Sequence, residues 1–134
     1  MRVLVDNNLS PRLARAIDTL VTPNHQVVAL RDKFPHDAKD VEWIEALGNE
    51  GGWVVLSGDV RITKRPAERR AWHRSRLKGF FLAPGWSKMP NLEKTARLLL
   101  WWPKLVTQEG LVGPGAVFQI PINAGSRLNQ IPVP

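Results

Sequence analysis

Residues 53–59, WVVLSGD, decide the fold, because a short apolar run ends there in the polar tip Ser57-Gly58-Asp59. Residues 1–8, MRVLVDNN, have the same form, since the apolar run to Val5 ends in Asp6-Asn7-Asn8. Short apolar runs bounded by turn-forming residues are typical of buried strands. We therefore expect two buried strands, each of which places polar side chains at its carboxyl end.

Stretches with helical signals separate the expected strands. Ser10 and Pro11 form an N-cap followed by a proline at the first helical position. Helices are expected over residues 11–20, 38–47 and 66–77, and in a fourth segment that Asn91 caps and Pro103 stops. Further strands are expected over residues 26–30 and 79–83, with an edge strand over 116–122. Strands that alternate with helices indicate an α/β fold whose mostly parallel sheet is covered by helices.

The chain has the length and composition of a single globular domain. It contains 134 residues, of which 43% are hydrophobic and 23% charged. We expect one domain over residues 1–122 and a loose C-terminal tail over 123–134. No apolar run approaches the roughly 18 to 20 residues of a membrane span, and the first residues lack the pattern of a signal peptide. A cytoplasmic protein with no membrane partner is therefore expected.

The residue types exclude several kinds of site. The absence of cysteine excludes disulfides, zinc-thiolate sites, iron–sulfur clusters, a thiolate nucleophile and the zinc deaminases. The three histidines, His25, His36 and His73, are scattered, so a histidine-based metal site is not expected. The chain also lacks a glycine-rich phosphate loop of the form G-x-x-x-x-G-K-[ST].

The positive charge is concentrated in one segment. The net charge is +7, and residues 61–78 hold eight basic residues against one acid, Glu68. This segment therefore carries the whole net charge, because the remaining basic and acidic residues balance. A concentrated positive field favours a polyanionic partner, and nucleic acid is the commonest one. A solvated basic helix face is the alternative explanation of the same residues.

Three aspartates are candidates for a shared site. Ligands of open parallel sheets bind beyond the carboxyl ends of the strands, where Asp6 and Asp59 are expected to converge if their strands are neighbours. Asp40, in the first turn of the second expected helix, is placed to join them. Oxygen ligands without sulfur or histidine suit a hard cation such as Mg²⁺ or Mn²⁺. Each acid also has an ordinary explanation as a helix cap, a first-turn acid or a turn residue, so spacing alone leaves the metal site open.

Three blocks of the sequence resemble the motifs of PIN-like domains, in the order that this family has them. They are LVDNNLSP (residues 4–11), DVEWI (40–44) and VVLSGD (54–59). The nearest resemblance is to VapC-type toxin components, especially a small subgroup with a short Asp-x-Asn-Leu-Ser-Pro block near the N-terminus. The likeness covers residues 1 to about 62 and continues less distinctively through FFLAPGW (80–86).

The resemblance implies a metal-dependent endoribonuclease with a three-layer α/β/α fold. The family's three acids fall on Asp6, Asp40 and Asp59, which would be both the catalytic residues and the ligands of Mg²⁺ or Mn²⁺. The family's hydroxyl residue falls on Ser57. The metal is expected to activate water for in-line attack on an RNA phosphodiester. Resemblance to VapC-type toxins also implies a cognate antitoxin that covers the acidic groove, and a homodimer is expected.

One position departs from the family's pattern. Many members carry a further acid two residues beyond the third one, where this chain has Arg61, and an aromatic residue where it has Ile62. Either a three-acid site binds the metal more weakly, or Glu42 or Glu68 completes the site from another direction. Glu42 is poorly placed for that, because it follows Asp40 by two residues and points about 200° around the helix from it. The departure bears on activity more than on fold.

The substrate is expected to lie over the acids and the start of the basic segment. We expect RNA to contact Asn8, Ser57, Arg61, Lys64, Arg65, Arg69 and Arg70. The basic residues begin two positions after Asp59, so the first of them lies beside the proposed metal site.

Other classes of protein also gather acids at strand ends. A response-regulator receiver needs an acid pair after its first strand, and Asn7 breaks that pair. A haloacid-dehalogenase-type phosphatase needs an aspartate where Asn8 stands. A catalytically inactive PIN-like protein that binds RNA or a partner protein stays open as the alternative, with Trp72 and the Trp101-Trp102 pair as base-stacking candidates. Tryptophans inside helices are more often part of the core.

Overall fold

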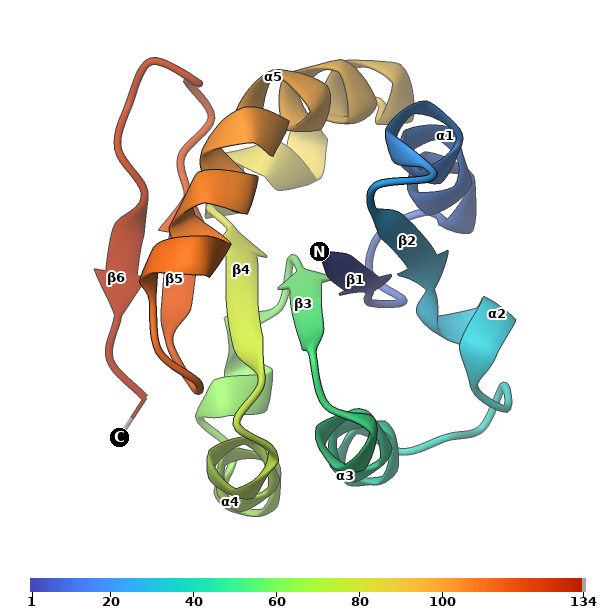
Figure 1. Cartoon of the computed structure of the whole chain (residues 1–134), viewed down its shortest axis with the longest axis vertical. Coiled ribbons are helices and arrows are strands. Elements are labelled where there is room, and N and C mark those ends of the chain that lie inside the picture. The colour runs from blue at the N-terminus through green and yellow to red at the C-terminus, as the bar shows by residue number, and fades with distance from the viewer. Residues whose placement is uncertain (134) are drawn as a thin grey trace.

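A six-stranded sheet with the order β2-β1-β3-β4-β5-β6 forms the centre of the computed structural model, which describes residues 1–133 (Figure 1). The strands are β1 (Arg2–Val5), β2 (Gln26–Ala29), β3 (Trp53–Ser57), β4 (Lys78–Leu82), β5 (Val117–Ile120) and β6 (Asn129–Ile131). The pairings from β2 through β5 are parallel, and β6 pairs with β5 in the antiparallel sense. The sheet is therefore mostly parallel, as the alternating pattern predicts.

Helices cover both faces of the sheet, with α1 and α5 on one face and α3 and α4 on the other (Figure 1). The α-helices are α1 (Pro11–Val21), α2 (Leu30–Lys33), α3 (Asp40–Glu50), α4 (Pro66–Ser75) and α5 (Asn91–Leu111), and the 3₁₀-helices are η1 (Val60–Thr63) and η2 (Pro84–Lys88). Two buried apolar clusters match these faces: Leu13 and Trp101 belong to one, and Trp43 and Trp72 to the other. The expected three-layer α/β/α fold is confirmed. No helix within residues 1–133 is long and apolar enough to cross a membrane.

Helix α1 forms where the capping signals predict it. The Ser10 hydroxyl accepts a hydrogen bond from the backbone N–H of Arg12 at 3.2 Å, and Pro11 occupies the first helical position. The first backbone N–H groups of a helix lack partners within the helix. Ser10 accepts a hydrogen bond from one of them, and Pro11 has no N–H group that would need a partner. Leu13 and Ile17 then lie buried on the same face of α1. The helix consequently begins directly after the loop that carries the polar tip of β1.

The pairing of β1 with β3 aligns their carboxyl ends. Val5 lies opposite Leu56, and the backbone N–H of Asp6 donates to the Leu56 carbonyl at 2.9 Å. This register brings Asp6 level with the end of β3, where Ser57 is the last strand residue. All five residues of β3 are buried, since the strand lies in the interior of the sheet between β1 and β4. The two polar tips therefore emerge side by side.

The fourth helix is longer than the sequence predicts. It begins at Asn91 itself, after Pro90 as its N-cap, and continues through Pro103 to Leu111. The expected stop at Pro103 is wrong because the apolar face of α5 extends across it, with Leu98, Trp101 and Leu105 all buried. An interior proline costs about 3 kcal/mol, and burial of these large side chains outweighs that cost.

Part of the stretch expected to be a loose tail joins the sheet. Residues Asn129–Ile131 form β6, with Asn129 opposite Gln119 of β5. The segment expected as an edge strand therefore lies inside the sheet, and its buried residues Val117, Phe118 and Ile120 contribute to both faces. Residue 134, which also belongs to the expected tail, lies outside the described residues.

Two of the tryptophans considered for base stacking are core residues. Trp72 and Trp101 are fully buried, each with 0% of its surface exposed. Trp102 is half-buried, and its ring packs edge-on against the His25 ring at a centroid distance of 5.6 Å. Trp72 and Trp101 therefore have no ring face free to stack on RNA.

We expect Gly79→Ala to lower the free energy of unfolding by about 1 to 3 kcal/mol. A Cβ atom at this position of β4 would lie 2.7 Å from the Phe81 ring and 3.0 Å from the Trp72 ring, both of which are buried. The matched control is Gly110→Ala in α5, where nothing lies within 4 Å of the added atom. Alanine favours helices over glycine by up to about 1 kcal/mol, so the control should be neutral or stabilising. Urea unfolding measures both, and equal effects would contradict the close contact at Gly79.

Candidate active site

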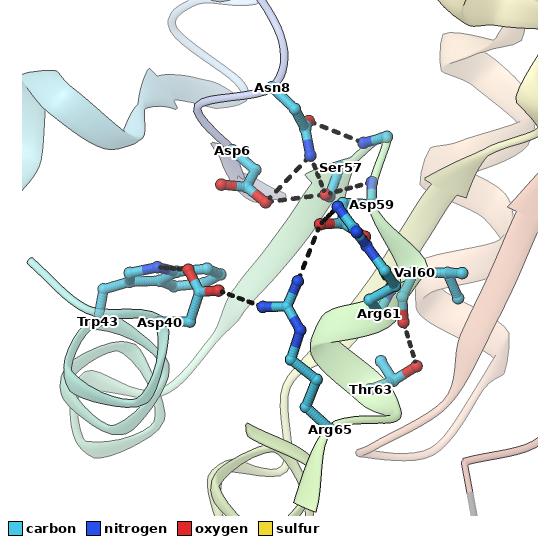
Figure 2. A network of polar contacts seen from close by, with 11 residues as sticks. Asp6, Asn8, Asp40, Trp43, Ser57, Asp59, Val60, Arg61, Thr63 and Arg65 are labelled. Atoms are coloured by element: carbon cyan, nitrogen blue, oxygen red, sulfur yellow. Dashed lines mark hydrogen bonds and ion pairs between the residues drawn. The ribbon is translucent and has the colours of Figure 1, made fainter. Parts of the chain in front are cut away.

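Asp6 follows β1 directly and is nearly buried, with 7% of its surface exposed. The backbone N–H of Asn7 donates to Asp6 Oδ1 at 2.7 Å, and the Ser57 hydroxyl donates to Asp6 Oδ2 at 2.9 Å (Figure 2). A longer contact of 3.5 Å joins the Asn8 side-chain amide to the same Oδ2 atom. Within residues 1–133 this carboxylate has no cationic partner, so neutral donors alone hold a buried charge.

Hydrogen bonds of Ser57 and Asn8 connect the polar tips of β1 and β3. The fully buried Ser57 Oγ accepts from the Asn8 amide at 3.1 Å and from the backbone N–H of Asp59 at 2.9 Å. The Asn8 side-chain oxygen in turn accepts from the backbone N–H of Gly58 at 2.9 Å. These hydrogen bonds join the loop after β1 to the loop after β3 (Figure 2). Ser57 and Asn8 therefore position the acids on the two strand tips.

Asp59 caps η1 and pairs with an arginine two residues further on. Its Oδ1 accepts from the backbone N–H of Arg61 at 3.0 Å and from Arg61 Nε at 2.8 Å, while Oδ2 accepts from Arg61 Nη2 at 3.1 Å. These hydrogen bonds, opposed in part by desolvation, hold the pKa of Asp59 below its ordinary value. Asp59 is therefore a carboxylate that stays charged across the neutral range.

Asp40 begins α3, and its side chain is held from two directions. Trp43 Nε1 donates to Asp40 Oδ1 at 3.0 Å, and Arg65 Nη1 lies 3.7 Å from Asp40 Oδ2. The other terminal nitrogen of Arg65 lies 3.9 Å from Asp59 Oδ2. Figure 2 shows the Arg65 guanidinium standing between the two acids. Arg65 therefore bridges Asp40 and Asp59 from its place just before α4.

Burial and the neighbouring negative charges raise the pKa of Asp6. Burial is the largest cause, and the negative charges of Asp40 and Asp59 add to it, while the hydrogen bonds from Ser57 and Asn7 act in the opposite direction. The structure therefore brings the three predicted aspartates to one end of the sheet, near enough to affect one another. A positive charge between the three acids would act in the opposite direction and lower the pKa of Asp6.

The three acids are not close enough together to form a complete metal site. Across residues 1–133, no three histidine, aspartate or glutamate side chains are grouped as they would be to hold an ion together. Arg65 stands between Asp40 and Asp59, and Arg61 pairs with Asp59 through both carboxylate oxygens (Figure 2). The donor set itself fits a hard cation, because it consists of carboxylate oxygens and leaves the Asp6 charge without a cationic partner.

The remaining basic residues that were expected at the site are not joined to the three acids. Lys64 and Arg70 are exposed and Arg69 is half-buried, and none of them contacts the three acids in the described part of the chain. Within residues 1–133, Glu42 and Glu68 likewise share no hydrogen bond or ion pair with the three acids. The bridge made by Arg65 and the hydrogen bond from Trp43 are features that the sequence analysis missed. The hydrogen bond from Trp43 to Asp40 could have been predicted from the sequence, since residues three positions apart on a helix lie on the same face.

Comparison with protein families identifies the class of domain that carries this site. Residues 1–84 match the family model described as a PIN-like domain, a stretch that includes all three acids and the whole basic segment. Searches of the curated proteins and of the solved structures found no match. Since the match covers more than half of the chain, the protein belongs to the PIN-like domain family. PIN domains are generally nucleases, and the fold is of this nuclease type.

We expect the raised pKa of Asp6 to make the free energy of unfolding depend on pH. A carboxyl whose pKa is raised on folding stabilises the protein fully below its ordinary value of 3.8, and this contribution is lost as the pH rises through the raised value. The stability of the wild type relative to Asp6→Asn should therefore increase as the pH falls from about 7 towards 4. Urea unfolding in EDTA across this range measures the difference. A relative stability that decreases with falling pH would contradict the effect of burial.

Proposed function

We propose that the protein is a divalent-metal-dependent endoribonuclease, in which Asp6, Asp40 and Asp59 hold Mg²⁺ or Mn²⁺. The observation that carries the proposal is the Asp6 carboxylate, which is nearly buried, faces two further acids and has no cationic partner among the described residues. A buried charge of this kind is costly unless it is paired or coordinates a metal. When bound, a divalent cation lowers the pKa of water and neutralises charge on a phosphate.

The chain's own residues supply the positioning in this proposal. Ser57 and Asn8 fix the orientation of Asp6, and Trp43 fixes that of Asp40. Arg61 pairs with Asp59, and Arg65 pairs with Asp40 and Asp59. If a cation takes over those carboxylates, both guanidinium groups become free to bind phosphate oxygens, which arginine contacts bidentately. The arginine that replaces the family's further acid thus gains a role in substrate binding.

A second candidate function is supported by the same arginines. Because Arg61 and Arg65 already neutralise Asp59 and Asp40, the chain can also be a PIN-like protein that binds RNA or a partner without cutting it. The test uses the purified chain and a single-stranded RNA labelled at one end, with Mg²⁺, Mn²⁺ or EDTA. The enzyme cuts the RNA with either metal and not in EDTA. Binding without cleavage under every condition would favour the second function.

We further propose that the protein acts as the toxin of a toxin–antitoxin pair and forms a homodimer. This follows from the resemblance to VapC-type toxins, and an uncontrolled ribonuclease harms the cell that makes it, so a protein inhibitor over the acidic groove is needed. Expression of the wild type should arrest growth, whereas Asp59→Asn should not. Light scattering should give twice the chain mass of 15.1 kDa. Normal growth with the wild type, or a monomer, would contradict the respective part of the proposal.

A further inference from the structure

A cavity of about 360 Å³ opens next to the candidate active site, across the carboxyl ends of β4 and β5. Asn8 and Gly58 line it, and the same two residues belong to the network that orients Asp6. The cavity and the acids are therefore two parts of one surface. A volume of this size lies within the range of roughly 300 to 1,000 Å³ that is usual for small-molecule sites.

The walls of the cavity are largely apolar. Leu9, Phe81 and Leu82 are buried core residues that contribute to its lining, together with Trp86 from η2. Trp86 Nε1 donates to the Ile120 carbonyl at 3.0 Å, so the polar atom of this indole is already satisfied. Since these four side chains are almost fully buried, the apolar surface open to a ligand comes from their half-buried and exposed neighbours in the lining, Val60, Ala83, Pro84 and Ile131. This surface suits a flat, weakly polar ring.

Two polar side chains in the lining have no partner of their own. Lys94, in the first turn of α5, is half-buried, and its side-chain ammonium makes no ion pair or hydrogen bond within residues 1–133. The side chain of Gln119 in β5 is likewise half-buried and unpartnered in the described part of the chain. A half-buried cation favours an anionic group, and a free amide presents both a donor and an acceptor. The cavity thus combines an apolar wall with one site for a charge and one for a hydrogen-bonding edge.

We propose that this cavity binds a nucleobase of the RNA next to the phosphate that is cut, with Lys94 on the adjoining phosphate and Gln119 on the base edge. The inference rests on the proposed function, because it names how the same surface holds its RNA. Single-stranded RNA is recognised by splaying a base out of the stack, packing its face on apolar or aromatic groups and hydrogen-bonding its edge. Apolar walls, an amide and a cation are the groups that this mode of binding requires.

The test measures binding in EDTA, so that it does not depend on catalysis. The four 5′-nucleoside monophosphates, ribose 5-phosphate and inorganic phosphate are titrated into ¹⁵N-labelled protein, and the signals of the Gln119 side chain and the Trp86 indole are followed. At least one nucleotide should bind about fivefold or more tightly than ribose 5-phosphate, because burial of one base contributes at least that factor. Equal affinities, or shifts confined to residues outside the cavity, would overturn the proposal.

Variants separate the two polar contacts. Gln119→Leu should reduce the advantage of the preferred nucleotide over ribose 5-phosphate, and Gln130→Leu, on the neighbouring strand outside the cavity, should not. Lys94→Ala should weaken nucleotides and ribose 5-phosphate alike, whereas the exposed Lys88→Ala removes the same charge without touching the lining. Equal effects of a variant and its control would contradict the assigned contact.

The same experiment distinguishes failure of this inference from failure of the proposed function. Nucleotide binding in the cavity by a protein that does not cut RNA would support the base pocket and reject the nuclease. Metal-dependent cleavage with the same preference among the bases in wild type and Gln119→Leu would support the nuclease and reject the assigned role of Gln119. The two proposals therefore fail through different measurements.

Discussion

Asp59→Asn is expected to lower the rate of RNA cleavage at least about 100-fold while leaving the protein folded, since stabilisation of transition-state charge by a metal is worth several kcal/mol. The variant removes one of the three proposed metal ligands. It keeps the hydrogen bond from the backbone N–H of Arg61 to Oδ1, and asparagine caps helices as well as aspartate does. The lost ion pairs join Asp59 to Arg61 and Arg65, whose side chains are 70% and 44% exposed, and such surface pairs contribute little to stability.

The control for Asp59→Asn is Asp32→Asn. Asp32 also pairs with an arginine through both oxygens, at 3.0 and 2.7 Å from Arg15, but it lies in α2 and outside the network of the three acids. Its substitution should leave cleavage unchanged. Single-turnover cleavage measures the rate, and urea unfolding checks the fold. If Asp59→Asn cuts as fast as the wild type, Asp59 is not a metal ligand.

Neutralising the free basic side chains should strongly weaken RNA binding and its dependence on salt. Each phosphate contact to a single strand contributes about 0.7 to the slope of log affinity against log salt concentration, so loss of three contacts should reduce the slope by about 2. The variant replaces Lys64, Arg69 and Arg70 by alanine, because these three have no ion pair within residues 1–133. Arg65 is kept, since its contacts with Asp40 and Asp59 would mix effects on the acids with effects on RNA.

The matched control removes the same charge from another part of the surface. Arg12, Arg31 and Arg127 are exposed and lie outside the basic segment, and their replacement by alanine also lowers the net charge by three. Fluorescence anisotropy over a range of salt concentrations measures both slopes in EDTA. If the variant of the basic segment has the same salt-dependence slope as the control, α4 and the residues just before it do not contact the RNA.

The strand tips illustrate what sequence patterns predict well. The repeated apolar run and polar tip identify β1 and β3, and a parallel pairing then puts Asp6 and Asp59 at the same end of the sheet. That conclusion needs only the direction of the strands and the period of the side chains. The cap of α1 is equally local, since Ser10 and Pro11 act on the helix that follows them. Local chemistry and simple topology are sufficient for these elements.

Features that depend on distant packing were not predictable in this way. The passage of α5 through Pro103 depends on burial of Leu98 and Leu105 against the sheet, which outweighs a local helix-breaking signal. The addition of β6 depends on a free edge of β5, which the polar composition of residues 123–134 does not indicate. The bridge from Arg65 to Asp40 joins residues on different elements. The number of residues between Arg65 and Asp40 does not indicate how far apart their side chains lie in the folded protein.

The measurement that tests the central claim most directly is the position at which Mn²⁺ binds the wild-type protein. This paramagnetic ion broadens the NMR signals of nearby amides, and the account predicts early and saturable loss of the signals of Asn7, Val41 and Asp59. The same titration of Asp6→Asn should broaden these signals only at much higher Mn²⁺ concentrations. Broadening that is spread over other surfaces, or that is the same in Asp6→Asn, would contradict a metal site at the three aspartates.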